Sequence, residues 1–382
     1  MKPFAQVPSQ MPRSGIREIM DRSAKIAGAI HLEVGQPDFP TPPHIIEAAN
    51  QALADGWTKY VANAGVDRLR EAAAAYLNRK TGVATTPEQV LITTGAVTSC
   101  ATSFMVTCNR GDQVLMPDPA WPNYAMAARL IGAEVIPYSL LPQRDFLPDL
   151  DELERLVTDR TRLLLICTPS NPTGQVYDDD LLAKLVAFCR RHDIYLLSDE
   201  IYGEITFGRP HASALPHDTD GRVILVTGVS KSYSMTGFRI GFTRASADYI
   251  EIAAKLQEPL VSCAAGFSQL AACAAVEGPQ ECVEQMRQAY EHRRDIALDV
   301  LRSHDLYRYT PGGAFYLLVD ISESGLDGHA FSLRLLDEEK VAVAPGTTFG
   351  QLAADHVRIS FAADEDDIRE GMERLCRMVR RG

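Results

Sequence analysis

The sequence predicts an α/β fold with two parts: a large domain with a mostly parallel sheet sandwiched by helices, and a smaller α+β domain. Two observations favour the large sheet. Apolar runs of strand length alternate with helical stretches, and polar motifs follow several of these runs. A change of pattern near residue 279 favours the smaller domain. The 382 residues are 46% hydrophobic and 23% charged, which is ordinary globular composition and enough chain for two domains.

Short apolar runs predict the strands of the large domain. These runs do not alternate with polar residues, which is typical of strands that helices cover on both faces. The predicted strands are residues 90–93, 113–116, 162–168, 194–197 and 223–226.

Helices are predicted between these strands. One begins near residue 98 and ends near residue 108, directly after the glycine at position 95. Another follows three acids at 178–180, which favour a helix N-terminus. Its apolar residues recur at helical spacing: Leu181, Leu182, Leu185, Val186 and Cys189. We therefore assign residues 45–278 to the large domain.

The rest of the chain predicts the small domain. A long charged helix at 280–304 leads to the stretch 307–319 and then to a helix near 330–339. Short apolar runs at 341–343 and 357–361 precede a C-terminal helix. We expect residues 1–44 and 279–382 to form this domain together.

Composition and charge argue against several classes of partner. A formal net charge of -12 disfavours nucleic acid and anionic membranes, but not a small anionic ligand in a basic pocket. The nine histidines include no H-x-H or H-E-x-x-H pattern, so no metal site is predicted. No segment approaches 18 uninterrupted apolar residues, and the first 15 residues do not resemble a signal peptide. Eight scattered cysteines without a C-x-x-C pair predict buried thiols in the reducing cytoplasm.

Three polar motifs begin where predicted strands end. They are 169–174 (PSNPTG), 198–202 (SDEIY) and 228–231 (GVSK), and a fourth motif, GFRIG, follows at 237–241. Open α/β sheets bind ligands at the carboxyl ends of their strands, so Asn171, Asp199 and Lys231 should converge on one crevice. Singly, each has an ordinary explanation as a turn, a helix cap or a surface lysine. The order and spacing of all four motifs together favour a ligand-binding site.

Residues 228–241 (GVSKSYSMTGFRIG) resemble the lysine-attachment signature of class I aminotransferases at every constrained position. The similarity covers nearly the whole chain and is greatest to the branch with prokaryotic aspartate and aromatic aminotransferases. It implies a fold type I enzyme with a seven-stranded type of sheet and pyridoxal 5'-phosphate (PLP) as cofactor. The implied reaction moves an amino group from an amino acid to a 2-oxo acid by a ping-pong mechanism. Other motifs of the family occur in its order: GQPDFPTP at 35–42, PAWP at 119–122, PGGAF at 311–315 and HVRISF at 356–361.

The resemblance assigns roles around the cofactor ring. Lys231 forms the Schiff base with PLP and afterwards moves the proton between the substrate Cα and the cofactor. Asp199 pairs with the pyridine nitrogen and keeps it protonated, so that the ring accepts electron density. Asn171 and Tyr202 donate hydrogen bonds to the phenolic oxygen. Trp121 stacks on the ring.

The resemblance also places the cofactor phosphate. Backbone N–H groups of Gly95, Ala96 and Val97, at the start of a helix, suit a dianion. Ser230 adds a hydroxyl group and Arg239 a guanidinium fork.

Three further residues are assigned by the resemblance. Arg358 clamps the α-carboxylate of the substrate with a bidentate, charge-assisted pair, which also orients the Cα–H bond. Gly35 adds a backbone contact beside this carboxylate, and Asn171 also belongs to the substrate site. Tyr60 reaches the phosphate from a second subunit, which implies a homodimer with shared active sites.

The sequence departs from part of this branch in the residues that determine the substrate. Some members have a lysine just after the phosphate loop, and this lysine binds a second carboxylate of the substrate. In this sequence the corresponding residues, 95–98, are Gly-Ala-Val-Thr and include no basic residue. This favours a neutral aliphatic or aromatic donor, with glutamate or 2-oxoglutarate as the usual second partner. Arg13 and residues 14–16 are candidates to lie over the substrate.

Two other functions stay open. The same fold and cofactor serve C–S lyases and cyclases, which also begin from a Cα carbanion. Catalytic release of pyruvate and ammonia without an acceptor would favour a lyase. A third possibility is a catalytically silent, PLP-binding regulator, which would turn over no amino acid.

Overall fold

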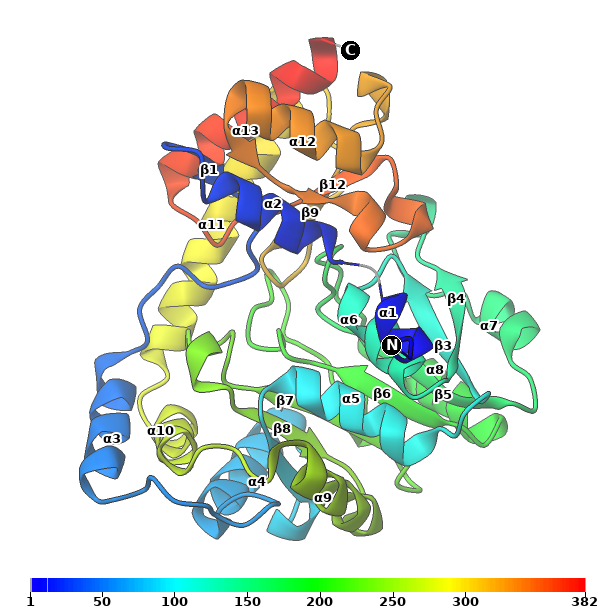
Figure 1. Ribbon diagram of the computed structural model, residues 1–382, viewed down its shortest axis with the longest axis vertical. Coiled ribbons are helices and arrows are strands. Elements are labelled where there is room, and N and C mark those ends of the chain that lie inside the picture. Colours follow the sequence, from blue (N-terminus) through cyan, green and yellow to red (C-terminus); the bar gives the residue numbers. More distant parts are fainter. Residues whose placement is uncertain (1, 12, 382) are drawn as a thin grey trace.

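The computed structural model describes residues 2–11 and 13–381. A seven-stranded sheet covered by helices forms the lower part of Figure 1, and a second group of helices and short strands lies above it. The fold class that the sequence predicts is therefore confirmed.

The large sheet has the strand order β2-β8-β7-β6-β5-β3-β4. Every neighbouring pair is parallel except those of β8, which runs antiparallel to both β2 and β7. All five strands predicted from apolar runs are present, with ends shifted by no more than two residues, whereas β4 and β8 were not predicted. The strands are β2 Val90–Thr93, β3 Gln113–Asp118, β4 Glu134–Ser139, β5 Thr161–Cys167, β6 Tyr195–Asp199, β7 Val223–Gly228 and β8 Gly241–Arg244.

Helices cover both faces of this sheet because successive strand residues point in opposite directions. Leu163, Leu165 and Leu197 pack into one apolar cluster with α5, α6 and α9. Leu164 and Leu196 pack into another with α4, α8 and α10. The helices of this part are α3 Pro43–Ala54, α4 Asp67–Thr81, α5 Ala96–Thr107, α6 Pro122–Leu130, α7 Leu150–Leu156, α8 Asp179–Arg191, α9 Ala247–Val261 and α10 Gly266–Glu277.

Helix α8 shows how local sequence sets an element. The Asp178 carboxylate accepts a hydrogen bond of 2.8 Å from the backbone N–H of Leu181, which caps the first turn. The apolar residues at helical spacing, Leu182, Leu185 and Cys189 among them, are buried against the sheet. The predicted helix is thus confirmed.

The upper group combines segments from the early and the late parts of the chain. Strand β1 (Ile30–His31) pairs in parallel with β10 (Val341–Ala342), and β12 (His356–Ser360) pairs antiparallel with β9 (Tyr316–Asp320) and β11 (Ala344–Pro345). The boundaries 44/45 and 278/279 stay a prediction, which this pairing of early and late strands supports. The helices are α2 Gly15–Ser23, α11 Glu281–Ser303, α12 Gly328–Glu339 and α13 Glu365–Arg381.

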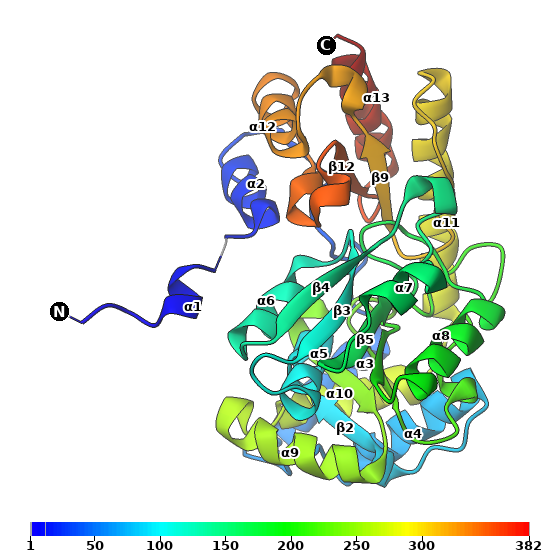
Figure 2. The same ribbon diagram turned by 90° about the vertical axis from the view of Figure 1, so that its right-hand side faces the viewer.

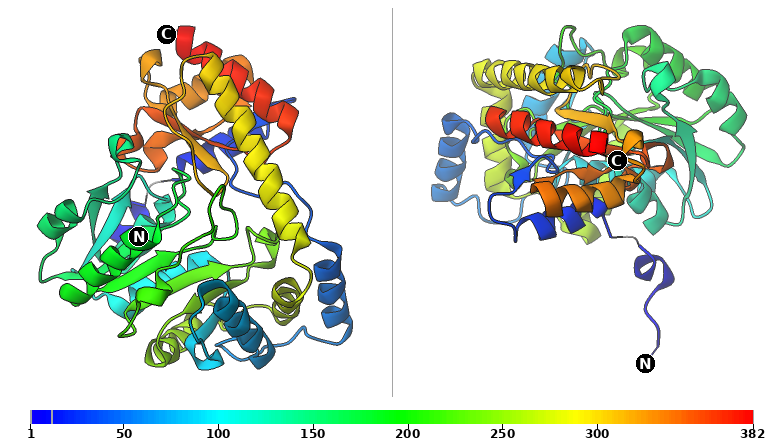
Figure 3. Two further views of the ribbon diagram at one scale, coloured as in Figure 1. Left: turned by 180° about the vertical axis from the view of Figure 1, so that it is seen from behind. Right: turned by 90° about the horizontal axis from the view of Figure 1, so that it is seen from above.

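Two helices stand out in the other views. Helix α11 runs from the upper group down to the helices of the lower part (Figure 3). Near the N-terminus, the short helix α1 (Gln6–Ser9) projects away from the rest and has no buried residue (Figure 2). None of the helices within the described ranges has the length and apolar character that crossing a membrane requires.

Candidate active site

Three polar residues at or just after the carboxyl ends of β5, β6 and β7 line one cavity of about 410 Å³. Asn171, Asp199 and Lys231 come together because these strands are neighbours and parallel, so their carboxyl ends lie at the same edge. Sequence reasoning predicted this convergence correctly.

Lys231 is positioned by the turn after β7. Its Nζ donates a hydrogen bond of 2.7 Å to the backbone carbonyl of Gly35. Burial, reinforced by the positive charges of Arg358 and Arg239, lowers the pKa of Lys231 to about 8. At neutral pH a larger fraction of this amine is therefore unprotonated, and nucleophilic, than in an exposed lysine.

Asp199 ends β6 and is 2% exposed. Its Oδ2 accepts hydrogen bonds from the Tyr124 hydroxyl (2.6 Å) and the Cys100 thiol (3.8 Å), and its Oδ1 accepts one from the N–H of Ile201 (3.1 Å). Burial raises the pKa of Asp199 to about 6, although these hydrogen bonds oppose the rise. A cation beside this carboxylate would stabilise its ionised form.

Tyr124 and Tyr316 are site residues that sequence reasoning missed. Tyr124 lies on α6, one turn after Trp121, and helical spacing from that residue could have indicated it. The Tyr316 hydroxyl lies 2.9 Å from the Tyr202 hydroxyl. Tyr316 also packs so closely on Gly35 that a Cβ atom there would overlap its hydroxyl group.

Arg358 on β12 is a buried cation to which no carboxylate within the described residues is paired. It is 2% exposed, and its guanidinium donates to Asn171 Oδ1 (3.1 Å) and to the Glu33 carbonyl (2.5 Å). Aromatic rings lie 4.4 Å (Tyr316) and 5.0 Å (Phe349) from its Cζ. Among the described residues no acid forms an ion pair with it, and its Nε has no hydrogen-bond partner. Because a buried charge is normally paired, Arg358 suits an anionic ligand.

The start of α5 and Arg239 form a second corner of the cavity that suits an anion. Ala96 and Val97 open the helix and line the cavity, and the first N–H groups of a helix lack intrahelical partners. Gly95 has φ 79°, and a Cβ atom there would collide with the Arg239 guanidinium. Arg239 and Ser230 line the same cavity.

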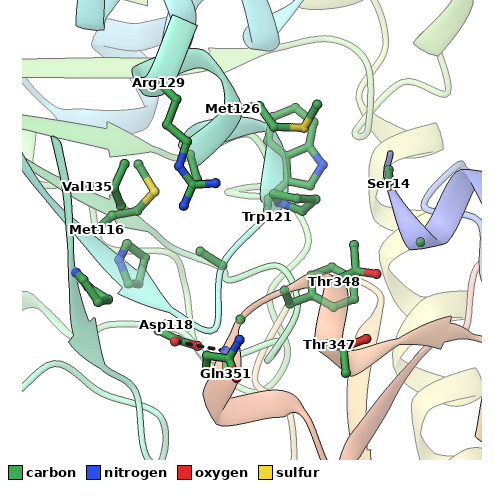
Figure 4. A pocket seen from close by; sticks show the side chains of 18 of the residues that line it. Ser14, Met116, Asp118, Trp121, Met126, Arg129, Val135, Thr347, Thr348 and Gln351 are labelled. Carbon is green, nitrogen blue, oxygen red and sulfur yellow. Dashed lines mark hydrogen bonds between the residues drawn. The ribbon is translucent and has the colours of Figure 1, made fainter. Parts of the chain in front are cut away.

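Trp121 lines both this cavity and a neighbouring one of about 620 Å³, which Figure 4 shows. Its ring packs edge-on against that of Tyr124, with centroids 5.2 Å apart. Arg13, Ser14 and Gly15 line the neighbouring cavity, whereas Ile16 lines the cavity of Lys231. The N-terminal segment thus borders both spaces.

Tyr60 lies apart from the other predicted residues. It is 89% exposed and belongs to a surface loop that does not line the cavity of Lys231. The remaining prediction, Gly35, does line this cavity.

Comparison with known proteins gives consistent matches over almost the full chain. The family described as "Aminotransferase class I and II" matches residues 27–375. Aspartate aminotransferase of Pyrococcus horikoshii is 36% identical over 366 residues, 95% of this chain and 94% of that protein. Aspartate/prephenate aminotransferase of Thermus thermophilus is 37% identical over 92% and 91% of the two chains. The solved aspartate aminotransferase of T. thermophilus with maleate has a TM-score of 0.94 and 34% identity, covering 99% of this chain and 100% of that chain.

Proposed function

Because this chain belongs to the class I and II aminotransferases, a family of PLP-dependent transferases, we propose that it moves an amino group from an amino acid to a 2-oxo acid by a ping-pong mechanism. Lys231 is the proposed attachment lysine. The observation that carries the proposal is the meeting, in one cavity, of a lysine, a buried carboxylate and a buried arginine that has no acidic partner among the described residues.

The residues of the cavity fit PLP. Its volume of about 410 Å³ lies within the range of small-molecule sites, about 300–1,000 Å³. We assign the phosphate to the corner formed by Gly95, Ala96, Val97, Ser230 and Arg239, and the ring to the space between Asp199, Tyr202, Asn171 and Trp121. When bound, the cofactor supplies an electron sink for the substrate carbanion.

The protein groups then act in distinct ways. Asp199 supplies a buried negative charge, which favours a protonated ring nitrogen. The Tyr202 hydroxyl and the Asn171 amide donate hydrogen bonds to an oxyanion. Lys231 Nζ, with its pKa lowered to about 8, takes the proton from the substrate Cα and returns it.

Arg358 is the proposed clamp for the substrate α-carboxylate. In an Arg358→Leu variant, kcat/KM for an amino acid donor should fall by about two to three orders of magnitude, since losing one partner of a buried charged pair costs about 2–5 kcal/mol. For a matched amine donor that lacks the carboxylate, kcat/KM of the same variant should change little. Steady-state kinetics with both donors measures the difference, and equal losses for both would show that Arg358 does not bind this group.

A neutral aliphatic or aromatic donor is proposed, since residues 95–98 at the phosphate corner, Gly-Ala-Val-Thr, include no basic residue. The names of the relatives include aspartate, prephenate and aromatic amino acids as substrates. Glutamate or 2-oxoglutarate is the proposed second partner.

We further propose a cytoplasmic homodimer in which Tyr60 reaches the partner's cofactor. In support, apolar side chains are exposed on neighbouring segments around this residue, which is typical of an interaction surface. They are Ile46 and Leu53 on α3, Trp57, and Leu260 and Val261 at the end of α9.

A half-reaction tests the proposed function. An amino acid added to the pure holoenzyme without an acceptor should remove the visible absorbance of the cofactor and release one equivalent of 2-oxo acid per chain. A 2-oxo acid should then restore the absorbance. The measurement is stopped-flow absorbance with quantification of the oxo acid, over a panel of donors.

The same assay separates the alternatives. Continuous release of ammonia and a 2-oxo acid, with no acceptor present, would indicate a C–S lyase. A PLP-bound protein that changes none of the donors would indicate a silent regulator.

A further inference from the structure

Directly behind Asp199, on the other side of the sheet, lies a buried acid that the proposed reaction does not use. Glu200 follows Asp199 in the chain and is 5% exposed. It lines a separate cavity of about 300 Å³, which shares no lining residue with the cavity of Lys231. The two adjacent acids therefore face two different compartments.

The Glu200 carboxylate is fully hydrogen-bonded. Its Oε1 accepts from the Ser198 hydroxyl (2.8 Å), the Ser213 hydroxyl (3.1 Å) and the N–H of Ala214 (3.1 Å). Its Oε2 lies 2.9 Å from Nε2 of His211. Three of the four partners belong to residues 211–214, so this side chain ties the end of β6 to that loop.

Within the described residues, the contact with Glu200 is the one side-chain hydrogen bond that His211 makes. Its side chain is 15% exposed, and its Nδ1 has no hydrogen-bond partner among the described residues. The ring packs on Gly203, where a Cβ atom would lie 3.0 Å from its Cδ2. Glycine at this position leaves room for the imidazole.

The turn that carries the proposed cofactor contacts is built around the Glu200 backbone. The N–H of Glu200 donates to the Val226 carbonyl (2.8 Å), and its carbonyl accepts from the N–H of Gly203 (2.9 Å). Asp199 precedes this residue and Tyr202 follows it by two positions. A shift of Glu200 would move both, and misplacement of about 1 Å can reduce a rate about 10²-fold.

We propose that His211 is a positioning residue, which acts through Glu200 to fix the Asp199 carboxylate and the Tyr202 hydroxyl where the cofactor meets them. This inference rests on the proposed function, since it concerns the same two cofactor contacts. It adds to that function a contact, between His211 and Glu200, that stabilises the site from the opposite face of the sheet.

The test compares two substitutions at His211 with a matched surface histidine. His211→Leu removes the donor, and His211→Gln retains one at similar reach. His192→Leu is the control, because His192 Nε2 also lies 2.9 Å from a glutamate, Glu154, but away from both cavities. The measurements are the PLP dissociation constant of the apoprotein, kcat and KM of the holoenzyme, and Tm.

His211→Leu should weaken PLP binding and lower kcat, each by about tenfold to a hundredfold, the size of effect that lost supporting contacts have at metal sites. KM for the amino donor should change less than about threefold, because Arg358 is untouched. His211→Gln should return both quantities to within about threefold of the wild type, and His192→Leu should leave them unchanged.

A lower Tm with an unchanged PLP dissociation constant and kcat would overturn the proposal, because His211 would then serve stability alone. If the leucine variant does not fold, His211→Asn, which is polar but too short to reach Glu200, takes its place with the same expectations. Wild-type protein that binds no PLP would refute the proposed function itself, a result that is visible before any variant is made.

Discussion

Replacing Lys231 with alanine should abolish turnover and remove the visible absorbance of the bound cofactor. The amine is buried and its pKa is lowered to about 8, so it is the one group in the cavity suited both to bond an aldehyde and to carry a proton. Any PLP that remains should exchange freely. Absorbance spectra and borohydride reduction followed by peptide mapping measure the loss.

The control for this prediction is Lys255→Ala. Lys255 is an exposed lysine that pairs with Glu251 at 2.6 Å on α9, away from the cavity. That variant should keep the wild-type spectrum and rate. A cofactor adduct that borohydride still fixes in the Lys231 variant would place the attachment lysine elsewhere.

Asp199→Ala should preserve folding and reduce kcat by several orders of magnitude. Loss of a single electrostatic partner of the developing charge already costs about 10²–10³-fold in rate, and here it also leaves the cofactor nitrogen without its acid. Single-turnover kinetics measures the effect. Asp193→Ala, which alters an exposed acid near Arg222, is the control, and near-normal rates for Asp199→Ala would contradict the assignment.

The sign of the stability change follows from the pKa. In the cofactor-free protein the folded-state pKa of Asp199 is raised to about 6, so burial penalises the ionised carboxylate. This penalty is absent at pH values below the ordinary carboxyl pKa, grows as pH rises from that value toward about 6, and is fully present above about 6. The alanine variant has no carboxylate at this position and so lacks the penalty. In the apo form, its stability relative to the wild-type protein should therefore be higher above that pH than below it. Thermal unfolding at pH 5 and pH 8 tests this sign.

Sequence reasoning predicted five of the seven strands of the large sheet and missed β4 and β8 for physical reasons. Strands β5, β6 and β7 are covered on both faces, which requires continuous apolar runs. Strand β4 lies at an edge, has exposed residues and contains Pro137, so its pattern is mixed. Strand β8 is only four residues long, GFTR, with one large apolar side chain.

The candidate site was predictable where its residues end predicted strands. Asn171, Asp199 and Lys231 belong to this group, and the resemblance added Arg358, Arg239 and the start of α5. The hydrogen bond from Tyr124 to Asp199 depends on how α6 packs on the sheet, which no local pattern contains. Likewise, only the folded structure shows that no acid among the described residues pairs with Arg358. The role of Tyr60 stays a prediction, since it requires a second subunit.

The opposite orientations of Asp199 and Glu200 limit how β6 can change during evolution. Because side chains alternate along a strand, deleting or inserting one residue within Tyr195–Asp199 would exchange the two acids between the faces of the sheet. Asp199 would then lose Tyr124 and Glu200 would lose His211 in a single event. Homologous genes can thus vary this strand by substitution but not in length, and gaps between aligned sequences should fall in the loops on either side of it.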